Sequence, residues 1–485
     1  MTSDGSYRLC GSLHQAVAEQ NLEVRSPVDG SLVGTVHEFT HDEIDKVLHD
    51  LVGNRQEWAD TPLDTRSRMV HQAADALESN AEELAQLLVM EIAKSAKDSR
   101  DEVTRTADFM RHTADEAKRV IGDSQFSDAF PRQNRNKLSV SYRVPLGVVL
   151  AIPPFNYPIN LGMSKVAPAL VAGNAVVLKP PTQGSVVTTR LVEILLGAGI
   201  PSSVLAIVTG RGSKIGDYLV ENPSVDMISF TGSTEVGRDL AKKAGMVPLL
   251  LELGGKDAAI VLSDADVEAA AADIVAGAFA YAGQRCTAVK RVLVTEPIAD
   301  DLVAALHRRI SELSVGDPRQ NCTITPLVDT EAAERADDLI SDAVSKGAKL
   351  LLGGSRMGNL VRPVLLDHVN TDMDIAWVEP FAPLLPVIRV ANAAEAVATS
   401  NRSEYGLQAA IFSRDVDAAM HMSLRLDVGT VQINGRTARG PDHFPFLGTK
   451  SSGMGTQGVR YSIEAMTRLK SMVFNMREQD LHGIY

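Results

Sequence analysis

Three side chains of this sequence have the chemistry of a covalent catalyst, although they lie far apart along the chain. Cys286 stands in GQRCTA beside Arg285, and a nearby cation favours the thiolate that acts as a nucleophile. Glu252 ends an apolar run in LELGGK, where burial raises the pKa of a carboxylate toward that of a base active near neutral pH. Asn156, between the prolines of PFNYP, supplies an amide donor of the kind that stabilises an oxyanion.

Each of these residues also has an ordinary structural interpretation. A cysteine of an intracellular protein is usually inert core, and an asparagine in such a loop usually marks a turn. A glutamate at the end of a strand is as readily turned to solvent as buried. Taken one at a time, Cys286 and Asn156 therefore favour the structural interpretation, and Glu252 favours neither.

A fourth feature is the loop FTGSTEVG (230–237), which follows an apolar run and opens a helical stretch. Free backbone N–H groups and the helix dipole at such a point bind a pyrophosphate. The loop is not the GxGxxG fingerprint, and a Gly-rich turn alone is more often only a turn.

The elements that must position these residues follow a strand, loop and helix rhythm after Gly147. Short apolar runs at 147–152, 175–179, 203–208 and 226–230 alternate with helical stretches at 184–199 and 213–222. A second series after Lys256 contains a small-residue helix (266–283) and strands at 289–296 and 428–434. This pattern predicts a doubly wound α/β fold with a parallel sheet.

Two flanking regions differ from this rhythm. Residues 40–122 are expected to form helices with charged faces, and one of their stripes carries Val103, Thr106, Ala107 and Met110. Residues 137–145 alternate apolar and polar side chains, which predicts a strand, and an arm of this kind often meets another subunit.

Composition excludes several classes of protein. The 485 residues suggest about three folding units, and the net charge of −13, without a run of five basic residues, argues against nucleic acid or anionic membranes as partners. Cys10, Cys286 and Cys322 lack metal-binding or disulfide spacing, which indicates a reducing cytoplasm and no metal site. Neither an export signal nor a membrane-spanning stretch is expected.

The features above occur together in the order and spacing of the aldehyde dehydrogenase superfamily, which the sequence resembles from about residue 25 to 475. EPFAP (379–383) nearly matches the family's EPFGP element. The motifs that resemble its non-phosphorylating glyceraldehyde-3-phosphate dehydrogenase branch are KPPTQGS (179–185), GQRCTAVKRVLV (283–294), FPFLGTKSSGMGTQG (444–458) and YSIEAMT (461–467). Several motifs in register favour the functional interpretation of all four features.

The resemblance implies a mechanism that suits the chemistry of these residues. Cys286 attacks an aldehyde, and the Asn156 amide with the Cys286 backbone N–H stabilises the oxyanion. Hydride then leaves for a nicotinamide, and water activated by Glu252 hydrolyses the thioester. The expected product is a free acid, and this hydrolysis separates the route from phosphorylating and CoA-acylating enzymes.

The resemblance also implies two sets of binding residues. The cofactor set is Lys179, Thr182, Asp217, Gly232, Ser233, Glu379 and Phe381. NAD-preferring relatives commonly carry glutamate where Thr182 stands, and lysine with threonine attracts a 2′-phosphate, so we expect NADP. The substrate set, directed at a phosphate, is Arg105, Asn156, Tyr157, Arg285, Cys286, Thr287 and Arg439.

Simpler explanations exist for four members of the substrate set. Arg105 follows Asp101 by four residues, so a solvated ion pair on a helix explains it. Arg439 lies in a Gly-rich loop, and simple exposure to solvent explains it. Arg285 could act only on the pKa of its neighbour, and Tyr157 could simply pack.

The expected organisation is an α/β aldehyde dehydrogenase-like chain in three parts. These are a Rossmann-type NADP-binding domain (1–127 and 146–255), a catalytic domain (256–455) and a small β oligomerisation arm (128–145 and 456–485) of a homotetramer. The sequence departs from the family pattern at Ala382, which replaces a glycine and is expected to shift the loop carrying Glu379, and before about Gln20.

The resulting hypothesis is irreversible oxidation of D-glyceraldehyde 3-phosphate to 3-phosphoglycerate with NADP. One alternative is an aldehyde dehydrogenase for another anionic aldehyde, such as succinate semialdehyde. A second alternative is an inactive structural or binding protein with this fold, against which the intact nucleophile, base and oxyanion donor argue.

Overall fold

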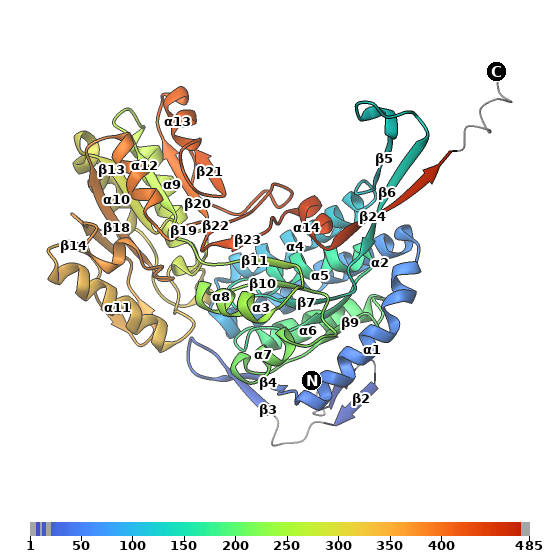
Figure 1. Cartoon of the computed structure of the whole chain (residues 1–485). Helices are drawn as coiled ribbons and strands as arrows, with labels where there is room; N and C mark the ends of the chain where they lie inside the picture. Colours follow the sequence, from blue (N-terminus) through green and yellow to red (C-terminus); the bar gives the residue numbers. More distant parts are fainter. Residues whose placement is uncertain (1–5, 10–11, 16–20, 477–485) are drawn as a thin grey trace.

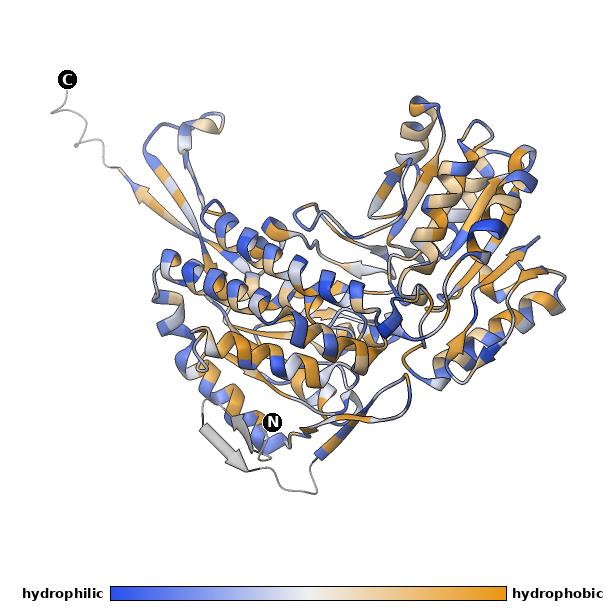
Figure 2. Cartoon of the chain, turned by 180° about the vertical axis from the view of Figure 1, so that it is seen from behind, coloured by the Kyte–Doolittle hydropathy of each residue, from blue (hydrophilic) through white to orange (hydrophobic). Residues whose placement is uncertain are grey.

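The chain folds around two large sheets, and a three-stranded sheet projects from this body (Figure 1). The computed structural model describes residues 6–9, 12–15 and 21–476, so Cys10 lies outside the described residues. Hydrophobic residues gather on the strands and on the helix faces that cover them, as Figure 2 shows. The α/β fold class predicted from the sequence is confirmed.

The first sheet has six strands, and five of them run parallel. The four apolar runs predicted as strands are neighbours in this sheet, because a parallel strand buried on both faces needs a continuous apolar sequence. In spatial order the strands are β23 (Gly453–Met454), β11 (Leu249–Glu252), β10 (Met227–Thr231), β7 (Val148–Ile152), β8 (Ala175–Leu178) and β9 (Leu205–Ile207).

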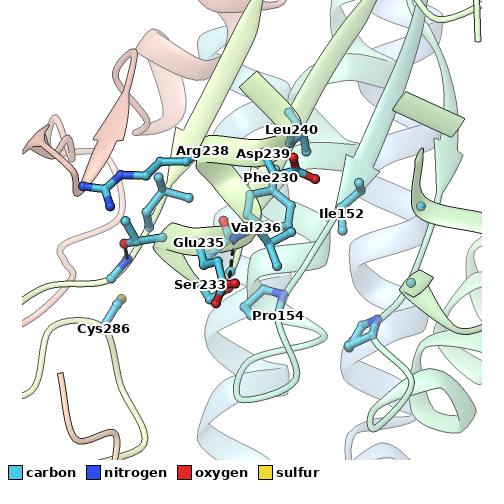
Figure 3. A pocket seen from close by; sticks show the side chains of 18 of the residues that line it. Ile152, Pro154, Phe230, Ser233, Glu235, Val236, Arg238, Asp239, Leu240 and Cys286 are labelled. Carbon is cyan, nitrogen blue, oxygen red and sulfur yellow. Dashed lines mark hydrogen bonds between the residues drawn. The ribbon is translucent and has the colours of Figure 1, made fainter. Parts of the chain in front are cut away.

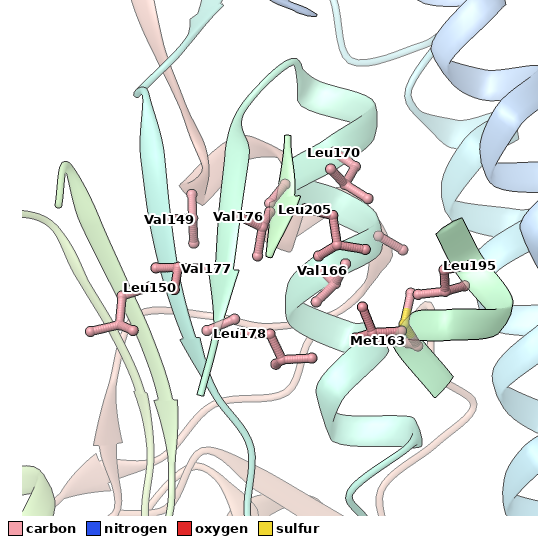
Figure 4. Packing of buried hydrophobic residues seen from close by; sticks show 14 of the residues in the cluster. Val149, Leu150, Met163, Val166, Leu170, Val176, Val177, Leu178, Leu195 and Leu205 are labelled. Carbon is pink, nitrogen blue, oxygen red and sulfur yellow. The ribbon is translucent and has the colours of Figure 1, made fainter. Parts of the chain in front are cut away.

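Helix α5 (Asn160–Ala172) connects β7 to β8 and lies at the centre of the core. Val166 and Leu170 of this helix pack near Val149, Val176 and Leu205 of the sheet (Figure 4). The other helices of this half are α1 (His41–Asp60), α2 (Leu63–Ser79), α3 (Ala81–Ile92), α4 (Ala96–Glu116), α6 (Ser185–Gly197), α7 (Gly212–Val220), α8 (Thr234–Lys243) and α14 (Val459–Ala465). Since α4 and α14 both pack on α5, this helix is buried on all sides.

The second sheet has seven strands and its own apolar core. Its strands in spatial order are β14 (Lys349–Leu352), β17 (Val364–Asp367), β18 (Leu384–Val390), β13 (Arg291–Thr295), β12 (Ala258–Val261), β20 (Gln408–Phe412) and β21 (Thr430–Ile433). Its helices are α9 (Val267–Phe279), α10 (Ala299–Ser311), α11 (Thr330–Ser345), α12 (Ala393–Asn401) and α13 (Val416–Ser423). The strands predicted at 289–296 and 428–434 are confirmed as β13 and β21.

After β21 the chain returns to the first sheet. Strand β23 pairs antiparallel with β11, and Gly453 stands opposite Glu252. A Cβ on Gly453 would overlap the Leu251 carbonyl oxygen, so only glycine allows this close pairing. The return carries the loop that contains Arg439 across the end of β11.

The projecting sheet joins segments that are distant in sequence. Strand β6 (Lys137–Pro145) pairs along its whole length with β24 (Thr467–Asn475), and β5 (Asp123–Phe126) completes the sheet. The strand predicted at 137–145 is therefore confirmed. Apolar side chains exposed on β24 are Leu469, Met472, Val473 and Phe474.

No helix in the described ranges is long and apolar enough to cross a membrane.

Asn174 connects the main sheet to the base of β24. Its Oδ1 accepts from the backbone N–H groups of Leu146 (2.7 Å) and Gly147 (2.9 Å), and its Nδ2 donates to the carbonyl of Met466 (2.9 Å). Because the side chain is fully buried, Asn174→Ala leaves these backbone groups without partners and should cost roughly 2 to 4 kcal/mol. The measurement is the midpoint of urea unfolding. Asn54→Ala, which removes one exposed hydrogen bond, is the control, and equal midpoints for the two variants would contradict the assignment.

Candidate active site

A cavity of about 1180 Å³ lies where β7, β10 and β11 end. Ligands of open α/β sheets bind at this edge. Figure 3 shows Cys286 at one end of the cavity, near the first residues of α8. The predicted site residues that line it are Asn156, Lys179, Asp217, Gly232, Ser233, Cys286, Glu379 and Phe381.

The loop between β10 and α8 is built to approach an anion. Ser233 caps α8, its Oγ accepting from the Val236 N–H at 3.3 Å. A Cβ at Gly232 would overlap the Phe230 ring, so the loop packs against its own strand. This ten-residue helix begins among residues that line the cavity, so its dipole and its first N–H groups place positive potential there. These features fit a dinucleotide pyrophosphate.

Lys179 lines the same cavity and is 5% exposed. Burial lowers its pKa to about 8, and its Nζ donates only to the Pro180 carbonyl among the described residues, so an anion in the cavity would stabilise its charge.

Thr182 is exposed and does not line the cavity, although Pro181 beside it does. Asp217 is exposed and forms an ion pair with Lys243 at 2.8 Å.

A strained segment places Cys286. The helix predicted over 266–283 ends at Phe279, because Tyr281 (φ 52°), Ala282 (φ 50°) and Gly283 (φ 74°) take left-handed backbone conformations. A Cβ on Gly283 would overlap the Ala382 carbonyl oxygen. The chain therefore turns sharply before the nucleophile.

The Cys286 sulfur lies 3.8 Å from Oε1 of Glu252. Burial, together with the negative charge of Glu252, raises the pKa of the Cys286 thiol to about 12, against a smaller opposing effect of Lys290. The Arg285 guanidinium donates instead to the Gly277 carbonyl. The expectation that Arg285 favours the thiolate is therefore wrong.

Glu252 is 3% exposed at the end of β11. Its Oε2 accepts from Arg439 Nη1 at 2.7 Å and from the Thr231 hydroxyl at 3.1 Å. Burial raises the pKa of Glu252, but the charges of Arg439 and Lys165 outweigh burial and hold it below its usual value. The expected raised pKa is therefore wrong, because two cations from distant segments meet this carboxylate.

Lys165 is one of the residues that the sequence analysis missed. It is fully buried on α5, its Nζ donates to the Thr231 hydroxyl at 2.6 Å, and burial lowers its pKa to about 7. The sequence feature that could have indicated this role is a single lysine inside the apolar stretch NLGMSKVAPALVA. A charge in such a helix has to face a polar partner.

Asn156 is 3% exposed, and its Nδ2 donates to the Gln284 carbonyl at 2.7 Å. The second N–H of this amide is the donor left for an oxyanion. A second missed lysine, Lys94, holds the loop: its Nζ donates to the Asn156 carbonyl at 2.7 Å and lies 3.4 Å from the Tyr157 ring centroid. Lys94 also forms a fully buried ion pair with Glu102, whose Oε1 accepts two backbone N–H groups of the same loop.

Two of the predicted phosphate ligands lie together. Arg105 donates to the carbonyl of Arg439 at 2.9 Å and holds Asp442 with two bonds of 2.7 Å. Its partner is therefore not Asp101, which corrects the simpler explanation of Arg105. Thr287 is buried, and its carbonyl accepts from the Thr437 hydroxyl at 2.9 Å.

Glu379 remains at the cavity despite the alanine at position 382. Its Oε1 lies 3.0 Å from Lys290 Nζ and accepts from the Gly255 N–H at 3.1 Å. Phe381, rather than Ala382, takes the left-handed conformation in this loop (φ 46°). Within the described ranges, no group of three or more His, Cys, Asp or Glu residues could hold a metal ion.

Comparison with known proteins identifies the family. The model of the aldehyde dehydrogenase family matches residues 14–472, and the chain belongs to this family. The NADP-dependent glyceraldehyde-3-phosphate dehydrogenase of Streptococcus equinus is 49% identical over 95% of this chain and 97% of its own length. A 3-sulfolactaldehyde dehydrogenase of Priestia aryabhattai is 40% identical over 85% of this chain and 86% of its own.

Solved structures show the same similarity. The NADP-dependent glyceraldehyde-3-phosphate dehydrogenase of Bacillus halodurans C-125, complexed with NADP, has a TM-score of 0.96 and 46% identity, covering 98% of this chain and 100% of its own.

The charge of Glu252 has a measurable effect on the nucleophile. Glu252→Gln removes one cause of the raised Cys286 pKa, so the thiolate fraction at pH 8 should increase about tenfold for each unit by which the pKa falls. Iodoacetamide should then alkylate Cys286 faster, as measured by mass spectrometry of the modified peptide. The control is Glu331→Gln, which changes an exposed glutamate in the first turn of α11. Unchanged or slower alkylation of the Glu252 variant would contradict this electrostatic assignment.

Proposed function

We propose that the chain oxidises D-glyceraldehyde 3-phosphate irreversibly to 3-phosphoglycerate with NADP. The observation that supports this most is a continuous line of contacts from the nucleophile to the paired cations. The Cys286 sulfur lies beside the Glu252 carboxylate, which pairs with the Arg439 guanidinium. The Arg105 guanidinium donates to the backbone carbonyl of Arg439. The names of the Streptococcus equinus and Bacillus halodurans relatives give the same activity.

The residues have the following roles in the proposed reaction. Loss of the thiol proton gives the Cys286 thiolate, which adds to the aldehyde carbon. The free N–H of Asn156 and the Cys286 backbone N–H stabilise the oxyanion. Bound NADP would accept the hydride that this adduct loses, and loss of the hydride leaves the thioester. Glu252 then takes a proton from water, whose oxygen adds to the thioester and displaces the Cys286 thiolate.

NADP would occupy the large cavity with its pyrophosphate at Gly232 and Ser233. Lys179 would hold the 2′-phosphate, with Thr182 beside it, because a buried ammonium gains most from a nearby anion. Asp217 belongs to the adenosine end, and Glu379 with Phe381 to the nicotinamide end.

The phosphate of the substrate would be held by Arg105, Arg439 and Tyr157, with Arg285 and Thr287 beside the nucleophile. The net charge of −13 does not oppose binding of a phosphate, because the cations that would hold the phosphate are gathered locally. We also propose the domain boundaries given above, a cytoplasmic location, and assembly into a homotetramer through the projecting sheet. The exposed apolar side chains of β24 support that assembly.

Another anionic aldehyde is a second candidate substrate. The similarity to a 3-sulfolactaldehyde dehydrogenase supports it, since a sulfonate suits the same arginines. Comparison of kcat/KM for glyceraldehyde 3-phosphate, 3-sulfolactaldehyde and succinate semialdehyde separates the candidates.

The decisive assay is NADPH formation from glyceraldehyde 3-phosphate without inorganic phosphate. Cys286→Ser should abolish NADPH formation, because no thiohemiacetal forms. Glu252→Gln should give a burst of NADPH followed by a steady rate lower by about 10² to 10⁴, because the thioester accumulates. No activity of the unmodified chain would indicate an inactive protein with this fold, and an unaffected steady rate would refute the role of Glu252.

Cofactor preference depends on charge at position 182. Thr182→Glu should lower kcat/KM for NADP and raise the NAD to NADP ratio, because a carboxylate repels the 2′-phosphate and holds a ribose 2′-OH. The control is Thr182→Gln, whose side chain has the shape of the glutamate variant but no charge. An equal ratio in the two variants, or unmodified chain that prefers NAD, would contradict the assignment.

A further inference from the structure

Arg439 is bound on both sides by groups of the chain itself. Its Nη1 donates to Oε2 of Glu252 and its Nη2 to Oε1 of Gln457, each at 2.7 Å. The side chains of Arg439 and Glu252 are 13% and 3% exposed, so solvent screens this ion pair little. The guanidinium also faces the Phe446 ring at 4.9 Å.

This pairing restrains the proposed base. Glu252 is in place for deacylation, with Oε1 3.8 Å from the sulfur of Cys286. Its other oxygen is engaged by Arg439, whose charge, with that of Lys165, holds the pKa of Glu252 down. A carboxylate with a lowered pKa is a weak acceptor for a proton from water.

The same guanidinium is the one proposed to hold the substrate's phosphate. A phosphate dianion binds arginine more strongly than a carboxylate does, and often through both terminal nitrogens. Glu252 and Gln457 each take one N–H of these terminal nitrogens, so a phosphate that binds both nitrogens competes with them for the same guanidinium. Gln457 is neutral, so of these two partners Glu252 is the one whose charge an incoming anion would replace.

Arg439 has space into which it can move. It lines a second cavity of about 280 Å³ together with Asp442 and Phe446. Asp442 is bound by Arg105 and lies 4.0 Å from Arg439 Nε. An anion near Arg105 would therefore draw Arg439 toward this cavity and away from Glu252.

We propose that the substrate's phosphate activates the general base by withdrawing Arg439 from Glu252. The inference rests on the proposed function, since it requires a phosphorylated aldehyde. With Arg439 neutralised by phosphate, burial dominates at Glu252 and the carboxylate becomes a stronger base. It takes one proton from water, the hydroxide oxygen bonds to the thioester carbon, and the carbon–sulfur bond breaks to release the Cys286 thiolate.

The test replaces the phosphorylated aldehyde by two separate molecules, an aldehyde without phosphate and a free anion. The chain is given D-glyceraldehyde and NADP with or without phosphite dianion, and stopped-flow absorbance separates the NADPH burst (acylation) from the steady rate (deacylation). Phosphite should raise the steady rate about tenfold or more. It should also move the inflection of the deacylation–pH profile to higher pH. Lys165 and Cys286 also face Glu252, and they are present in both conditions.

Arg439→Gln supplies the second arm. Without phosphite, it should deacylate the glyceraldehyde-derived thioester faster than the unmodified chain, because Glu252 is no longer paired. It should not respond to phosphite. Arg436→Gln, which removes an exposed arginine of the same loop, is the control. Arg439→Lys, which keeps the charge but cannot bind two partners as a fork, is used if the glutamine variant does not fold, and should lose most of the phosphite response.

The outcomes separate the inference from the function on which it rests. Loss of glyceraldehyde 3-phosphate oxidation by the unmodified chain would overturn the proposed function. If that activity is present, the inference alone is overturned by an unmodified chain that ignores phosphite. It is likewise overturned by an Arg439→Gln variant that deacylates no faster than the unmodified chain, or by either position-439 variant that keeps the full phosphite response.

Discussion

The buried carboxylate of Glu252 is the constraint on which the site depends. An ionised group that is 3% exposed persists only with compensating charge and hydrogen bonds. Arg439 and the Thr231 hydroxyl bond to it directly, and Lys165 supports it through Thr231. These partners come from a late loop, from β10 and from α5, so the architecture must bring three distant segments to the end of β11.

The path of the chain meets this requirement. Strand β23 joins the first sheet beside β11. Because of this pairing, the loop that leads from the second sheet to β23 passes over Glu252. The left-handed residues before Cys286 aim the sulfur at the same carboxylate. Helix α5 places Lys165 next to Thr231. The buried ion pair of Lys94 and Glu102 holds the Asn156 loop in place.

The site also reconciles an acidic protein with anionic ligands. The net charge of −13 belongs mostly to exposed side chains, whose fields are screened within about 10 Å. Lys179, Lys165 and Arg439 are buried or nearly buried, where each charge acts at short range. Under the proposed function, these local cations and not the total charge decide which anions bind.

Much of the fold and part of the site could be predicted from the sequence. Continuous apolar runs determined the central strands, because a strand buried on both faces admits few other sequences. Local motifs were sufficient to select Cys286, Glu252 and Asn156, since their neighbours along the chain show what each could do. The directions of the pKa shifts at Cys286 and Glu252 were not predictable in this way.

Those directions depend on charges that are distant in sequence. The sequence by itself determined the α/β class, the family and the candidates for the reacting groups, because these depend on local composition and spacing. Only the tertiary structure decided that Arg285 turns to Gly277, that Lys165 and Lys94 are buried at the site, and that Arg439 binds Glu252. Electrostatic energy depends on distance and burial in space, and neither is written in the order of the residues.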